Sequence, residues 1–160
     1  MARTLALVVL AAALTLPATL SAATATDGTL SVKRGHGIVL LKFTGTAIGR
    51  LAQGKVRIID KKPFDANSPV FRHCRVRYLS ATTTLCTGRR LSFRATDGRY
   101  VVRVQGGGMY LSAVGRGTVM VDGVGDQGLP DGVMSIDDGP YQSLPDAPMT
   151  FDLGTPPTQR

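Results

Sequence analysis

The two cysteines are the residues whose type and spacing most directly suggest chemistry. Cys74 and Cys86 lie twelve residues apart, an even number. In a hairpin that turns near Ser80, both side chains would therefore point to the same face. If the chain is exported, two cysteines predict a disulfide. Closing a loop of about a dozen residues would stabilise the fold by roughly 3 kcal/mol in the chain-entropy model.

A metal site is not predicted. Zinc needs about four ligands, and only His36 and His73 could join the cysteines, without a paired spacing such as CxxC. The C-terminal aspartates do not have the spacing of a calcium-binding loop, and most of them stand beside glycine, as turn residues do. The C-terminal aspartates considered for calcium are Asp122, Asp126, Asp131, Asp137 and Asp138.

One of the two thiols could instead be a nucleophile. The segment Thr84-Leu85-Cys86-Thr87 resembles part of the sortase motif, Thr-Leu-x-Thr-Cys, although the cysteine here comes one residue early. Sortases are exported β-barrel transpeptidases that use Cys, His and Arg. The resemblance implies Cys86 as the nucleophile, with His36 and either Arg94 or Arg99 as partners. A Cys86-dependent transpeptidase is therefore kept as an alternative function.

Basic residues dominate the first part of the chain. Residues 26–104 contain sixteen Lys and Arg against four Asp, whereas residues 105–160 contain two Arg against seven Asp. A surface of one sign attracts anions. On a strand through His73–Tyr78, Arg75 and Arg77 would project from one face, and Arg89 and Arg90 would extend that patch. The predicted anion-binding residues are Arg72, Arg75, Arg77, Arg89, Arg90 and Arg94.

Two explanations of this charge remain open. The basic face could bind anionic cell-envelope material, either a polymer or lipid headgroups. Alternatively, the charges only solvate a β surface and the acidic C-terminal third folds back on it, which would be a purely structural role. Nucleic acid is not expected, because it fits an exported protein badly and because few aromatics and no Trp leave no stacking platform. No cofactor is predicted, and the oligomeric state stays open.

Strands and turns are the elements expected to position these residues. Apolar and polar residues alternate with a period of two, and glycine-containing turn signals separate the alternating runs. All eleven acidic residues are Asp, which favours turns over helices, and the absence of Glu excludes the HExxH peptidase pattern. The predicted fold class is all-β, a single-domain sandwich or small barrel with a loop-rich C-terminal segment. Predicted strands include Leu30–Arg34, Ile38–Leu41, Lys55–Ile58, His73–Tyr78, Leu91–Arg94, Tyr100–Val102, Val133–Ile136 and Met149–Leu153, and predicted turns lie at 34–37, 53–54, 97–98 and 106–108.

An internal similarity links two parts of the chain. At an offset of 61 residues, segment 28–45 aligns with segment 89–106 without gaps. Glycines match at Gly37 with Gly98 and at Gly45 with Gly106. The match predicts an internal duplication and two pseudo-symmetric hairpin units.

The first twenty-five residues have the features of a secretory signal peptide. Arg3 supplies a positive start, and Leu5–Leu16 is an apolar run too short to span a bilayer. Ala23-Thr24-Ala25 offers the small-x-small pattern of a cleavage site. We therefore expect a signal peptide at 1–25, a β domain at 26–153 and a flexible tail at 154–160. The processed protein would lie outside the cell or in its envelope, without a stable membrane span.

In this layout the chain resembles the small exported β-rich proteins of unassigned role in high-GC bacteria. The resemblance rests on this layout and not on a diagnostic motif, and it implies no substrate, cofactor or catalytic residue. The sequence thus predicts a secreted, non-enzymatic β domain that binds anionic envelope or extracellular material through a basic face. The alternatives are the Cys86-dependent enzyme and a purely structural protein.

Overall fold

Two very long strands dominate the computed structural model, which describes residues 26–63, 65–124 and 131–154. They are β1 (Gly28–Asp60) and β4 (Thr83–Gly123), and they pair antiparallel. The predicted signal peptide and residues 155–160 of the predicted tail lie outside the described residues. No helix occurs among those described, so the all-β fold class is confirmed. The shorter strands are β2 (Val70–Arg72), β3 (Arg75–Tyr78), β5 (Val133–Ile136), β6 (Gln142–Ser143) and β7 (Met149–Leu153).

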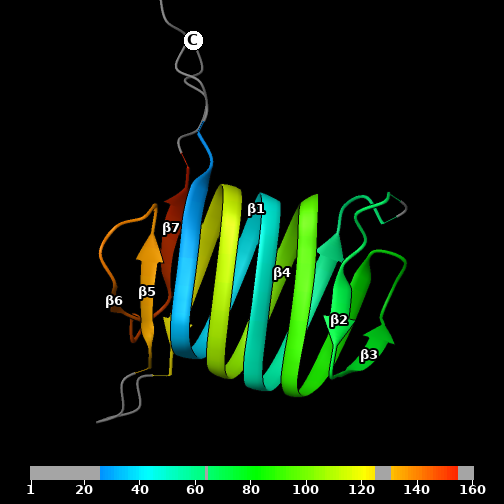
Figure 1. The fold of residues 1–160 in the computed structure, drawn as a ribbon, viewed down its shortest axis with the longest axis horizontal. Coiled ribbons are helices and arrows are strands. Elements are labelled where there is room, and N and C mark those ends of the chain that lie inside the picture. Colours follow the sequence, from blue (N-terminus) through cyan, green and yellow to red (C-terminus); the bar gives the residue numbers. More distant parts are fainter. Residues whose placement is uncertain (1–25, 64, 125–130, 155–160) are drawn as a thin grey trace, which may run out of the picture.

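β1 and β4 wind around one another as a flattened double coil (Figure 1). Gly37 of β1 pairs with Gly106 on one side and with Gly123 on the other, and these two glycines of β4 are seventeen residues apart. Each strand therefore has its partner on both flanks, and one antiparallel sheet folds back on itself into two layers. Two strands alone build most of a sandwich.

Glycines form two columns in this coil, about half a turn apart along each strand. At Gly45 the φ angle is +150°, and a Cβ atom would overlap the carbonyl oxygen of Val114 on the neighbouring turn. Only glycine tolerates both conditions without strain. We call the column Gly88, Gly54, Gly106, Gly37 and Gly123 the first glycine edge, and Gly98, Gly45, Gly115 and Gly28 the second glycine edge, each in the order of hydrogen-bonded neighbours.

These columns correct the prediction of turns at 34–37, 53–54, 97–98 and 106–108. No strand ends there, because β1 and β4 continue through all four segments. Glycine was expected to end a strand, since it usually marks a turn. Here it bends the strand from one layer into the other while the inter-strand pairing continues on both sides of the bend.

The core lies between the two layers and follows the period of two. Inward residues such as Val39, Leu41 and Val102 have no exposed surface, whereas their neighbours Lys42 and Arg103 are exposed. Several residues matched at the offset of 61 are buried alike, as Leu41 and Val102 are, but Arg34 is exposed where its match Ala95 is buried. The matched segments lie in β1 and β4, which pair with each other rather than forming separate hairpins. Their origin by duplication stays a prediction.

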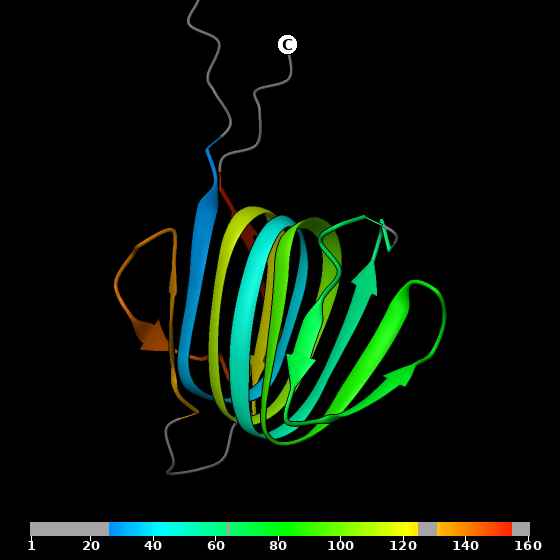
Figure 2. The ribbon, with the colours of Figure 1, turned by 45° about the vertical axis from the view of Figure 1, so that its right-hand side comes forward.

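The short strands extend the two ends of the double coil (Figure 2). β2 and β3 pair with the first part of β4 at one end. At the other end β5 pairs with β1, β7 pairs with β4, and β6 pairs with β5. β5 and β7 have the predicted bounds. The chain turns between β3 and β4 as expected near Ser80, whose amide donates to the Thr83 carbonyl at 3.3 Å.

The predicted disulfide between Cys74 and Cys86 is present. Cys86 lies in β4 opposite Val76 of β3, and it is completely buried. The bond thus ties the start of the edge strand β3 to the core. It is compatible with an oxidising extracellular location.

Tyr100 of β4, which pairs with Asp60 at the end of β1, combines burial with polar contacts. The side chain is 1% exposed, and its hydroxyl lies 2.7 Å from the Asn67 carbonyl oxygen and 2.9 Å from that of Thr96. Burial raises the pKa of this hydroxyl from 10.0 to about 12. Three carboxylates add to the increase, those of Asp60, Asp65 and Asp97.

This shift predicts a specific loss of stability in alkali. The folded state holds the Tyr100 proton more tightly than the unfolded chain does. The contribution of the protonated hydroxyl to the free energy of unfolding is therefore fully present below pH 10. It is lost as the pH rises from 10 to about 12. Urea unfolding across this range should show a falling free energy of unfolding. Tyr100→Phe should flatten that fall, and an equally steep fall in the variant would contradict the assignment.

Candidate anion-binding surface

All six predicted arginines lie at the β2–β3 end of the coil, but they face three sides of it. Arg72 and Arg94 line one shallow pocket, and Arg75 and Arg77 line another. Arg89 lines a third hollow, at the first glycine edge. Arg90, with a φ of 53°, is exposed beside it. Arg89 and Arg90 thus lie beyond the bend at Gly88, and the hollow that Arg89 lines shares Thr87 with the hollow of Arg75 and Arg77.

The bend at Gly88 explains the separation. β2 pairs with residues 92–94 of β4, beyond this bend, whereas β3 pairs with residues 84–87, before it. Between β2 and β3 the chain follows the same bend, with His73 at a φ of 57°. The predicted single strand His73–Tyr78 is thus shortened at its start to Arg75–Tyr78. A sequence pattern cannot reveal such a corner, because alternation continues across it.

Three further cations lie in the same two rows of paired residues as Arg75 and Arg77. Arg75 pairs with Thr87, which also pairs with Lys55. In the next row Arg77 pairs with Leu85, and beyond it come Arg57 and then Arg103. All five basic side chains are exposed; on β1 and β4 their neighbours along the strand, such as Val56 and Val104, are buried, whereas all of β3 is exposed. We define the basic face as Lys55, Arg57, Arg75, Arg77 and Arg103.

The cations of the basic face have no anionic partner within the described residues. Among the described residues one salt bridge is found, between Arg116 and Asp27 at 3.0 Å. Neither of these two residues belongs to the basic face. Arg57 and Arg103 are directly opposite each other on neighbouring strands. Like charges in that position destabilise a sheet. An anion bound between them would relieve the repulsion.

Two small hollows lie within the basic face. One, of about 290 Å³, is lined by Arg75, Arg77, Leu85 and Thr87. The other, of about 330 Å³, has Leu85 and Leu79 among its lining residues, together with Lys55, Arg57, Arg103 and Gln105. Leu85 is common to both. The surface thus offers apolar contact at the centre of a ring of positive charge.

The opposite layer also carries cations, but most of those that line its pocket already interact with other groups of the protein. The Lys33 ammonium lies 4.0 Å from the centre of the Tyr141 ring. The Arg50 guanidinium lies 4.4 Å from the centre of the Tyr110 ring. Arg94 donates from Nε to the Thr96 hydroxyl at 3.1 Å. These cations and Arg72 line a pocket of about 770 Å³. Because three of the four are already engaged, this layer is the weaker candidate.

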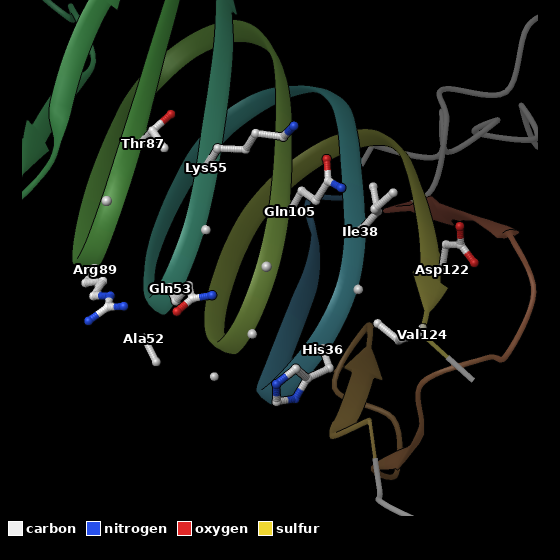
Figure 3. Close-up of a pocket in the computed structure, with 17 residues that line it drawn as sticks. His36, Ile38, Ala52, Gln53, Lys55, Thr87, Arg89, Gln105, Asp122 and Val124 are labelled. Carbon is white, nitrogen blue, oxygen red and sulfur yellow. The ribbon is translucent and has the colours of Figure 1, made fainter. Parts of the chain in front are cut away.

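A trough of about 1070 Å³ runs along the first glycine edge (Figure 3). Thr87, Lys55, Gln105, Ile38 and Asp122 follow one another across neighbouring strands and form one wall. Arg89, Gln53 and His36 line the other side. The trough adjoins the basic face, because Lys55 and Gln105 line both the trough and one of its hollows.

The residues expected for thiol chemistry are not arranged as a pair in this form of the protein. Cys86 is buried and bonded to Cys74, so it presents no thiolate. His36 is exposed in the trough, and its imidazole lies against Gly107. Over residues 26–63, 65–124 and 131–154, no three side chains from His, Cys and Asp are grouped to hold a metal ion. Asp126 lies outside these ranges.

The described part of the acidic C-terminal segment does not lie over the basic face. Asp137 accepts a hydrogen bond from the Thr29 amide at 3.0 Å, and Asp138 accepts one from the Thr29 hydroxyl at 2.9 Å. Thr29 is at the start of β1, on the far end of the coil from β3. Asp122 lies in the trough wall, separated from Lys55 by Gln105 and Ile38. These aspartates therefore leave the five cations uncovered.

No helix in the described part of the chain is long and apolar enough to cross a membrane. Comparisons with protein-family models, with curated proteins and with solved structures found no match.

Proposed function

We propose that the protein is an exported, non-enzymatic β domain that binds anionic envelope or extracellular material through the basic face. One observation carries the proposal, namely five exposed cations on adjacent strands with no acidic partner among the described residues. A protein that only needed solubility would not require two arginines to oppose each other across a strand pair. An anionic ligand supplies the missing counter-charge.

The spacing of the cations favours a ligand with repeated anionic groups. Neighbouring strands lie about 4.8 Å apart, so Arg57 and Arg103 span one such interval and Lys55 and Arg75 span two. Arginine binds phosphate and carboxylate groups with two parallel hydrogen bonds, which makes it a better anion ligand than lysine. Four of the five cations are arginines. Sheet pairing and the disulfide hold their backbones fixed before the ligand arrives.

Removing the opposed pair should weaken anion binding selectively. We expect Arg57→Gln with Arg103→Gln to reduce the affinity for polyphosphate at low salt about tenfold or more. Binding by the unchanged protein should weaken steeply as salt rises, because exposed charges are screened. Affinity is measured by retention on immobilised polyphosphate and by calorimetry over a series of salt concentrations.

The matched control removes the same charge from the opposite layer. Lys33→Gln with Arg94→Gln leaves the net charge equal to that of the first double variant. If the two variants lose affinity equally, binding follows net charge and the basic face is not the site. If the unchanged protein is not retained on polyphosphate even at low salt, the result contradicts the binding function and favours the purely structural alternative.

A further inference from the structure

The turn between β3 and β4 presents apolar side chains to solvent. Tyr78 is 82% exposed, which is the highest value among the large hydrophobic side chains of the described residues, and Leu79 is 49% exposed. We call these two residues the hairpin tip. They lie at the β2–β3 end, where Figure 2 shows the hairpin projecting from the coil. Adjacent exposed apolar groups mark interaction surfaces more often than isolated ones do.

The hairpin tip adjoins the basic face through Leu79. Tyr78 follows Arg77 directly along β3, so its side chain leaves the other face of that strand, at the end of the hairpin. Leu79 lines the same hollow as Lys55, Arg57 and Arg103. The apolar groups are therefore bordered by positive charge, and no described aspartate shares either hollow of the basic face.

The tip is held in place by the fold. The Leu79 amide donates to the Thr83 carbonyl at 2.8 Å, and Tyr78 pairs with Thr84 across the hairpin. The Cys74–Cys86 disulfide fixes the other end of β3. Exposure of Tyr78 and Leu79 is thus a property of an ordered hairpin. Exposing these apolar side chains to water is unfavourable in free energy, and burying them in an apolar phase would be favourable.

We propose that the anionic material bound by this protein is the surface of a lipid bilayer, with the hairpin tip inserted at the headgroup level. The proposal rests on the proposed function and names its ligand. A hydrophilic polymer would satisfy the cations but would leave Tyr78 and Leu79 in water. At a bilayer surface the arginines contact lipid phosphates, while the tyrosine ring takes the position that such rings favour between headgroups and acyl chains.

The first test measures binding to vesicles. The purified protein should co-sediment with vesicles of equal parts phosphatidylglycerol and phosphatidylcholine, and much less with pure phosphatidylcholine. Tyr78→Ser with Leu79→Ser should lower the affinity for the anionic vesicles about tenfold or more, whereas Tyr78→Ser alone, which leaves both hollows of the basic face intact, should leave retention on polyphosphate unchanged. The control, Tyr141→Ser with Val124→Ser, replaces two exposed apolar residues elsewhere and should bind like the unchanged protein. Thermal unfolding of each variant verifies that it folds.

A second test locates the tip directly. The chain contains no Trp, so Leu79→Trp introduces a single fluorescent reporter. On anionic vesicles its emission should shift to shorter wavelength and be quenched by brominated acyl chains. Tyr141→Trp, on the far end of the coil, should show neither effect.

The outcomes separate this proposal from the one on which it rests. Equal vesicle binding by the tip variant and the unchanged protein, or an unquenched Leu79→Trp signal, overturns insertion of the hairpin tip. Retention on polyphosphate without vesicle binding leaves the basic face as a polymer site and overturns the bilayer assignment alone. Vesicle binding that Arg57→Gln with Arg103→Gln does not weaken contradicts the basic face itself.

Discussion

Replacing Gly45 with alanine is expected to lower the free energy of unfolding by about 3 kcal/mol or more, a large share of the roughly 5–15 kcal/mol that stabilises an ordinary domain. The residue has a φ of +150°, where L side chains are strained. Its added methyl group would overlap the Val114 carbonyl oxygen and approach the Gly115 Cα to 2.7 Å. Both atoms belong to the backbone of the adjacent turn of the coil, so no side chain can move aside. Urea denaturation measures the difference.

The adjacent residue offers a matched control. Thr44 is exposed on the same strand, and Thr44→Ala should change the free energy of unfolding by less than about 1 kcal/mol, the span of strand propensities. Comparable stability of the two variants would show that the second glycine edge tolerates side chains. The requirement for glycine at the bends would then be wrong.

Loss of the disulfide is expected to destabilise the protein by roughly 3 kcal/mol, because the bond closes a loop with a sequence separation of 12. Cys74→Ala with Cys86→Ala removes it. β3 pairs only with β4 in the described sheet, so the variant should also hold Arg75 and Arg77 less firmly. We therefore expect weaker retention on polyphosphate together with a lower melting temperature.

Two comparisons make this prediction specific. Reduction of the unchanged protein should reproduce the loss, whereas the same reductant should leave the double variant unaffected. Thiol titration of the native protein should find both cysteines oxidised. One free and reactive thiol at Cys86 would instead support the Cys-dependent transpeptidase and contradict the structural role of the bond.

Local patterns predicted much of the fold, because each depends on residues close together in the chain. Alternation of apolar and polar residues identified buried positions such as Leu30 and Leu91, and it placed β5 and β7. The even spacing of Cys74 and Cys86 predicted their bond for the same reason. The turn predictions failed at Gly37 and its equivalents, since a glycine that bends a strand and one that ends it look alike in sequence.

The basic face was predicted only in part. Arg75 and Arg77 were identified, but the residues that join them come from other turns of the coil. Lys55 and Arg57 lie in the predicted strand Lys55–Ile58, and Arg103 directly follows the predicted strand Tyr100–Val102. Which of these outward residues share a layer depends on the register between β1 and β4. Nothing within either strand encodes that register in a form that one sequence reveals.

By itself, the sequence determined the strand-rich class, the alternation that separates core from surface, the disulfide and the excess of positive charge. These properties follow from residue types and short-range spacing. The tertiary structure alone decided that two strands wind into a double coil, because the neighbours of each residue are set by a turn of seventeen or eighteen residues. That winding separates Arg72 from Arg75 and brings Arg57 against Arg103, since cations distant in the chain become neighbours only when successive turns pair.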